Sequence, residues 1–235
     1  METVRDRMDE ELRVLRLLEA ERLAQAVFAR VVTDGVIAAG RYGTEVDRDI
    51  RAIASSVAGP LLAGPGRLVR SGPHAVIPSA YGTVDRLIGE DDVVTVDLSP
   101  LLAAHETGFA RTVVLGEDLR RHQLVDELTG LLTYAREVFR HSTNITGRLL
   151  YAEVRDLADE GGWRLGSWHV GRIAGTAMTQ APEVLADADL IAFENSRPLR
   201  RTDRAGFAAH WVMEIHLVDE RLGYGGTLKQ LLDLA

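Results

Sequence analysis

Residues 89–98 have the sequence Gly-Glu-Asp-Asp-Val-Val-Thr-Val-Asp-Leu. The β-branched run Val93–Val96 follows a polar, turn-forming segment, which is typical of a strand. An acid, Asp97, ends this run. Burial of a lone carboxylate is costly unless the group has a partner. The stretch therefore predicts a strand whose last side chain either points to solvent or belongs to a polar site.

Two further acids occupy similar places. Glu194 follows the apolar run 190–193, and Glu214 lies inside the apolar run 211–218. One such acid alone more often points outward from its strand. Three acids on strands from both halves of the chain instead indicate converging carboxylates. Such a group binds a divalent cation or shares a proton.

Outside these runs, the hydropathy pattern predicts two helices followed by strands, and then the same order a second time. We expect helices over residues 2–38, 44–57, 118–140 and 146–160, and strands over 68–70, 75–77, 92–98, 110–115, 190–194 and 211–218. The pair 92–98 and 110–115 should be antiparallel. The order predicts an α+β chain with two similar halves. We treat residues 1–235 as a single domain, with about 1–38 as an N-terminal helical extension.

Composition excludes several classes of protein. The 235 residues include no cysteine, so disulfides, thiolate ligands and a cysteine nucleophile are excluded, and any metal must use His, Asp or Glu. The net charge of -8 argues against nonspecific nucleic-acid binding. Residues 1–22 are charged throughout, and no apolar run of about 18 residues exists to cross a membrane. We therefore expect a cytoplasmic protein.

The order of these motifs resembles the pita-bread superfamily of methionine aminopeptidases, Xaa-Pro aminopeptidases and creatinases. The resemblance extends from about residue 20 to residue 233, without the separate N-terminal domain of the larger members. It rests on residues 89–98, 107–116 (Thr-Gly-Phe-Ala-Arg-Thr-Val-Val-Leu-Gly), 147–162, 191–194, 211–218 and 225–232. It implies two pseudo-symmetric α+β halves, with an antiparallel sheet and helices packed on its outer face.

The resemblance also implies a metal site, and the sequence departs from it. The family's peptidases hold two metal ions through two Asp, one His and two Glu. Three acids match these ligands: Asp97, Glu194 and Glu214. Gly108 stands in place of the second Asp, and Trp168 in place of the ligand His, with His169 beside it. Because the missing Asp normally bridges the two ions, a full dinuclear site is not expected.

Two states of this site remain open at the sequence level. Either no metal is bound, or one Mn, Fe or Zn ion rests on the three acids with His169 as a substitute ligand. Weaker substitutes for the ligand are His105, Glu106 and His216. In both states the site would serve a small-molecule substrate.

The family's two auxiliary histidines are replaced by Ser79 and Gly175. His216 lies two residues after Glu214, so a regular strand would place both on one face. It is a pocket residue or a hydrogen-bonded structural histidine. His74 could enter the pocket or lie solvated in a turn, and Trp168 could form a pocket wall or core. The candidate substrate-binding residues are His74, Ser79, Trp168 and Glu106.

The leading hypothesis is a diverged enzyme that hydrolyses a C–N bond in a small amino-acid-like, amide or amidine substrate. The creatinase branch implies that this fold can act without metal. His169 with Glu194 or Glu214, assisted by His216, would then provide acid–base catalysis. The alternatives are a single-metal hydrolase or peptidase and a non-catalytic binding module. No nucleic-acid or membrane partner is expected, whereas the long first helix suggests a homodimer.

Overall fold

The computed structural model describes residues 4–58, 66–77, 84–102, 107–175, 183 and 185–234. Its α-helices are α1 (Val4–Thr33), α2 (Gly43–Ala58), α3 (Leu119–His141) and α4 (Gly147–Glu160). Its strands are β1 (Val69–Ser71), β2 (Val93–Asp97), β3 (Ala110–Val114), β4 (Arg164–Leu165), β5 (His169–Ile173), β6 (Leu190–Ala192), β7 (Trp211–Asp219) and β8 (Tyr224–Leu231). Short 3-10 turns are η1 (Gly72–Val76), η2 (Ser99–Leu101) and η6 (Asp187–Asp189).

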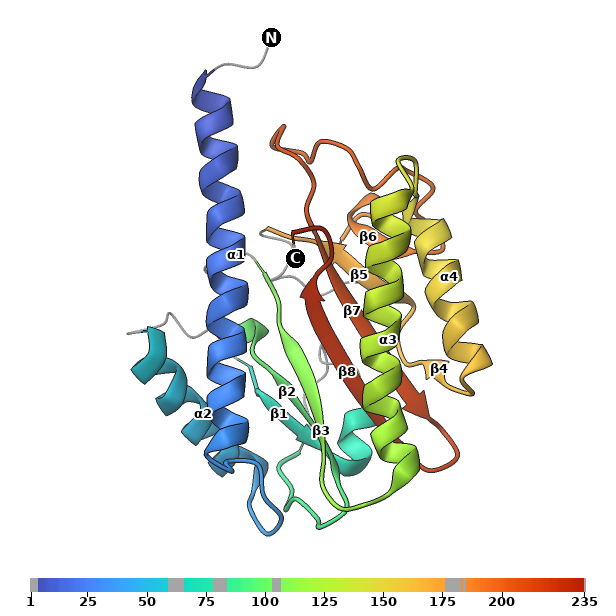
Figure 1. Cartoon of the computed structure of the whole chain (residues 1–235). Coiled ribbons are helices and arrows are strands. Elements are labelled where there is room, and N and C mark those ends of the chain that lie inside the picture. Colours follow the sequence, from blue (N-terminus) through green and yellow to red (C-terminus); the bar gives the residue numbers. More distant parts are fainter. Residues whose placement is uncertain are drawn as a thin grey trace.

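One antiparallel sheet joins both halves of the chain. Its strand order is β1-β2-β3-β8-β7-β5-β6, with β4 paired to β7. The last strand in sequence, β8, therefore lies in the middle, between β3 of the first half and β7 of the second. Helices α1 and α2 lie beside the first three strands, and α3 and α4 beside the second half (Figure 1).

The two faces of the sheet differ because side chains alternate along each strand. On β7, Met213, Ile215 and Leu217 are buried in a core with α3 and α4. On β2, Val94 and Val96 are buried in a second core with α1 and α2. Asp97 and Glu214 alternate with these residues along their strands and lie on the opposite face. We call this opposite face the inner face.

The α+β class, the antiparallel sheet and the pairing of residues 92–98 with 110–115 are confirmed. The first helix is shorter than the expected 2–38. It ends at Thr33, because Gly35 adopts a positive φ of 61° and the amide of Val36 bonds back to Val31.

Two strand predictions are wrong in detail. Residues 75–77 lie in and after η1, where Pro73 fixes the backbone and starts a 3-10 turn. The strand expected over 190–194 ends at Ala192, and Glu194 lies in the turn that follows. No helix in the described part of the chain is both long and apolar enough to span a membrane.

Candidate functional site

Four strands bring opposite charges together on the inner face. Asp97 of β2 pairs with Ala110 of β3, Ala110 with Lys229 of β8, and Lys229 with Glu214 of β7. Directly opposed residues of antiparallel strands point to the same face. Asp97, Lys229 and Glu214 therefore form one row across the centre of the sheet, and Arg172 of β5 joins it. We call these four residues the inner ionic cluster.

The contacts within the inner ionic cluster are short. The Lys229 ammonium Nζ donates to Asp97 Oδ2 at 2.8 Å and lies 2.6 Å from Glu214 Oε1. The Arg172 guanidinium donates to both oxygens of Glu214, from Nε at 2.9 Å and from Nη2 at 3.1 Å. The second oxygen of Asp97 accepts the Ser99 amide at 3.0 Å. Every carboxylate oxygen of the cluster is thus bonded.

Burial and charge act in opposite directions on these acids. The side chains of Asp97 and Glu214 are each 8% exposed. Burial raises the pKa of Glu214, but the charges of Lys229 and then Arg172 outweigh it and hold that pKa well below its usual value. Burial likewise raises the pKa of Asp97, and Lys229 and Arg70 bring it below its usual value. Both acids are therefore carboxylates in the folded protein.

His169, which is 4% exposed, begins β5 beside this cluster. Burial lowers its pKa, the Glu214 charge raises it and the Arg172 charge lowers it, with a net decrease. Its Nδ1 has no hydrogen-bond partner among the described residues. The ring is therefore neutral near pH 7 and has a nitrogen available for a further bond.

His216 lies on the inner face two residues from Glu214, as predicted. Its Nε2 donates to the Ala75 carbonyl of η1 at 2.9 Å, so the neutral ring keeps a lone pair on Nδ1. Burial lowers its pKa to about 4. A Cβ at Gly166 would come within 2.7 Å of this Nδ1, so the ring is closely covered there. These contacts are those of a fixed, neutral histidine.

Arg70 of β1 is a buried cation that sequence reasoning missed. It pairs with Thr95, which shares the face of Asp97, and the residue is 6% exposed. Burial lowers its pKa, and the charges of Asp97 and then Glu214 raise it in part. Its Nη2 is buried, and no hydrogen bond or ion pair of its side chain is found within the part of the chain that the structure describes.

The remaining predicted site residues are dispersed. Glu194 is exposed, so the structure does not bring it into the buried cluster as the predicted third carboxylate. Trp168 is 42% exposed, with its ring 5.3 Å from that of His169, so it is not a core residue. His74 is half-buried in η1. Ser79, His105 and Glu106 lie outside the described residues.

The donor set does not fit the single metal ion that the sequence left open as one of two states of the site. No group of three or more His, Asp or Glu that could hold an ion is found among the described residues. The two buried carboxylates direct their oxygens at Lys229 and Arg172, which compete with any cation for the same lone pairs. A single ion on Asp97, Glu194, Glu214 and His169 would need Glu194 to leave the surface and Lys229 to leave the cluster.

Two cations of the cluster could have been identified from the sequence. Lys229 is the only lysine of the chain, and it lies within the strand 224–231. Arg172 interrupts the apolar strand 169–173. A cation within a buried strand needs a carboxylate partner, just as an acid needs a cation.

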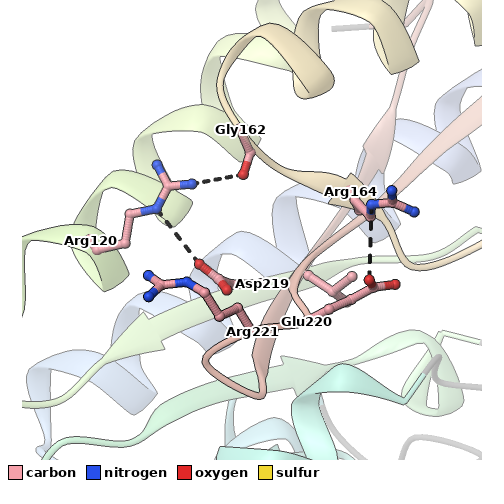
Figure 2. Close-up of a pocket in the computed structure, with 7 residues that line it drawn as sticks. Arg120, Gly162, Arg164, Asp219, Glu220 and Arg221 are labelled. Carbon is pink, nitrogen blue, oxygen red and sulfur yellow. Dashed lines mark hydrogen bonds and ion pairs between the residues drawn. The ribbon is translucent and has the colours of Figure 1, made fainter.

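A separate depression of about 420 Å³ lies between α3, β4 and the end of β7. Figure 2 shows its lining, with Arg120 beside Asp219 at 3.8 Å and Arg164 beside Glu220 at 3.9 Å. Arg120 also donates to the Gly162 carbonyl at 2.8 Å. These are partly exposed ion pairs of the kind common on protein surfaces, so the depression carries no argument for catalysis.

Of three comparisons with known proteins, only the comparison with solved structures gives matches. No protein-family model matches the chain, and no curated protein matches it in sequence. Solved structures do match. The X-Pro aminopeptidase from Thermotoga maritima MSB8 has a TM-score of 0.70 and 16% identity, over 97% of this chain and 62% of that one. The Xaa-Pro dipeptidase from Bacillus anthracis has a TM-score of 0.65 and 20% identity, over 94% and 59%.

A prolidase from Thermococcus sibiricus is similar to the same extent, with a TM-score of 0.68 and 19% identity over 97% of this chain and 57% of that one. The chain thus spans less than two thirds of the length of each of these three proteins. At such identities the likeness concerns the fold alone. The chain has the pita-bread fold, which it shares with solved X-Pro aminopeptidase and prolidase structures.

Proposed function

We propose that this protein is a diverged pita-bread enzyme that acts on a small amino-acid-like or amide compound without a metal ion. The supporting observation is the ion pairing of Asp97 and Glu214 with Lys229 and Arg172. The two carboxylates stand at positions that resemble those of family metal ligands, yet side-chain cations occupy their oxygens. The positive charge that the resemblance assigns to metal ions is supplied by the chain itself.

His169 is the residue to which we assign proton transfer. In the tautomer protonated at Nε2, its Nδ1 offers a lone pair that can accept a proton from water. The Glu214 carboxylate acts electrostatically on His169 and would stabilise the imidazolium that forms. The depressed pKa of Glu214 makes it a poor proton donor, so its role is electrostatic.

The reaction that suits these groups is hydrolysis of a C–N bond. His169 takes a proton from water as the water oxygen bonds to the substrate carbon. The imidazolium then returns that proton to the nitrogen as the C–N bond breaks. Asp97, Lys229 and Arg172 would keep their own charges during this step and would not exchange protons with the substrate.

The second candidate is a non-catalytic binding module. It is favoured by the same ion pairs, because neither buried carboxylate is left to act as a base. The two candidates differ in one respect: the enzyme requires His169 to turn over a compound, whereas the module only requires that a compound bind.

The first experiment combines metal titration with a substrate screen. We expect calorimetry of chelator-treated protein with Mn, Fe and Zn to give no stoichiometric binding. We also expect turnover of at least one member of a panel of small amides, amidines and dipeptides in the presence of chelator. His169→Gln should abolish this turnover, and His122→Gln, at an exposed position on α3, should not.

The outcomes separate the candidates. Stoichiometric metal binding that is needed for turnover contradicts the proposal. Binding of a panel member without turnover, in the wild type and in His169→Gln alike, supports the binding module instead.

A further inference from the structure

Arg70 is a cation of the inner face whose side chain makes no hydrogen bond or ion pair with the described residues, although the charges of Asp97 and Glu214 act on it. Its neighbours on this face are accounted for: Asp97 accepts from Lys229 and the Ser99 amide, and Glu214 accepts from Arg172 and Lys229. Glu183 acts electrostatically on Arg172 and His169 and does not contribute to the charge felt by Arg70. No hydrogen bond from Arg70 to these carboxylate oxygens is found among the described residues, although both charges act on it.

Burial makes this arrangement costly. Arg70 is 6% exposed and its Nη2 is buried without a partner among the described residues. An unpaired buried guanidinium is destabilising, and buried polar groups without partners are rare in folded proteins. The cost points to a role in binding.

The surroundings of Arg70 are suited to a small ligand. The opposed residue on β2 is Thr95, and the next residue on that face is Asp97. His216 lies near enough for the Arg70 charge to act on it, and its ring is fixed by the Ala75 carbonyl of η1. Thr227, opposite His216 on β8, has a buried hydroxyl without a partner in the described chain. The Arg70 guanidinium of β1 and the Thr227 hydroxyl of β8, with β2 and β3 between their strands, thus each have a buried polar atom without a partner among the described residues.

We infer that Arg70 binds the carboxylate of a small monoanionic ligand on the inner face. The planar guanidinium matches a carboxylate through two parallel N–H···O bonds. The nearby carboxylates of Asp97 and Glu214 disfavour a dianion such as phosphate. This inference rests on the proposed function in one respect, since it specifies that the amino-acid-like substrate carries a free carboxylate.

The test uses direct binding, so it does not depend on turnover. Calorimetry and thermal shift would compare acetate, propionate, glycine and N-acetylglycine with acetamide and propionamide. We expect at least one carboxylate to bind and the uncharged amides not to bind. Arg70→Met should weaken carboxylate binding at least about tenfold, the loss expected for a charge-assisted pair. Arg48→Met removes an exposed arginine of α2 and should leave binding unchanged.

Stability serves as the second readout. Because the Arg70 side chain has no hydrogen bond or ion pair among the described residues, Arg70→Met should unfold at the same or a higher temperature than the wild type. A variant that is folded, equally stable and unable to bind carboxylates supports the inference. Carboxylate binding that survives Arg70→Met, or preferential binding of inorganic phosphate, overturns it, as does a failure of every carboxylate to bind.

The two proposals fail in different ways. Carboxylate binding that needs Arg70, with no turnover of any compound, supports the carboxylate site and contradicts the enzyme. Metal-independent turnover that is equal in Arg70→Met and the wild type supports the enzyme and contradicts the carboxylate site.

Discussion

At the scale of single residues, Lys229 is central because it bonds to both buried acids at once. It lies 2.8 Å from an Asp97 oxygen and 2.6 Å from a Glu214 oxygen, and its side chain is 3% exposed. Removal of one partner from a buried charge network leaves the others uncompensated, which costs more than the pairs contribute when intact.

We therefore predict that Lys229→Met lowers the free energy of unfolding by about 3–5 kcal/mol. Urea unfolding followed by circular dichroism would measure the loss. The control is the double variant Asp97→Asn with Lys229→Met, which removes one charge of each sign. It should recover part of the loss. A loss below about 1 kcal/mol for the single variant would mean that the ion pairs are not formed in solution.

The sequence predicted the acids of this site better than its cations. Asp97 and Glu214 were identified because a carboxylate at the end of, or within, an apolar strand needs an explanation. Lys229 bonds to Asp97 across 132 positions of sequence, and only the strand order of the finished sheet makes them neighbours. Glu194 was misplaced because its strand ends two residues earlier than the apolar pattern indicates.

At the scale of elements, two glycines test how strands and helices pack. A Cβ at Gly171 of β5 would lie 2.6 Å from the Val212 carbonyl oxygen of β7 and 2.8 Å from Ile191 Cδ1. Because the first of these is backbone, the strands would have to move apart. Gly130 of α3 has no atom within 4 Å of such a Cβ.

We predict that Gly171→Ala lowers the free energy of unfolding by about 1–3 kcal/mol through overpacking. Gly130→Ala, the matched change in a helix, should raise it by about 0.5–1 kcal/mol, because alanine favours the helix. Chemical denaturation of both variants tests the pair. Equal effects of the two changes would contradict the close approach of β5 and β7.

Helix α1 is tied to the sheet by a histidine. His210 bonds through Nδ1 to Asp233 Oδ2 at 2.7 Å and through Nε2 to Glu10 Oε1 of α1 at 3.0 Å. Burial lowers its pKa, but the hydrogen bond and charge of Asp233 and the hydrogen bond of Glu10 outweigh burial and raise it above the usual value. The protonated form is therefore favoured by folding.

The sign of the resulting pH dependence follows from linkage. A raised pKa in the folded state adds stability that is complete below the unfolded pKa of about 6.5 and is lost as pH rises through the folded value. We predict that His210→Gln lowers stability by about 1–3 kcal/mol at pH 6 and has a smaller effect at pH 9. Thermal melts across this range, with His122→Gln as the control, would test it. A cost that does not change with pH contradicts the role of the protonated ring.

Element prediction succeeded where local signals were strong. Thr146 and Asp118 cap the helices expected near them, with side chains that accept the Leu149 and Arg121 amides. The region 164–173 was not predicted as strands, because Gly166 and Gly171 break its pattern. Those glycines are explained by tertiary contacts, with the His216 ring and with the Val212 carbonyl, which no local pattern contains.

At the scale of the whole molecule, the resemblance to the pita-bread superfamily predicted the fold correctly, and solved structures confirm it. The resemblance does not determine the oligomeric state, and the expected homodimer stays a prediction. The exposed side chains of Met8, Leu12 and Leu15 recur at helical spacing on α1 and mark the surface at which a second copy would be sought.

The central position of β8 has a consequence for synthesis of the protein. Ribosomes extend the chain from its N-terminus, so strands β1 to β7 emerge before the strand that joins the two halves. Until Lys229 follows, Asp97 and Glu214 lack the ammonium that accompanies their burial. The full sheet is therefore expected to close only after β8 has been synthesised, because β8 is the strand that pairs with both β3 and β7.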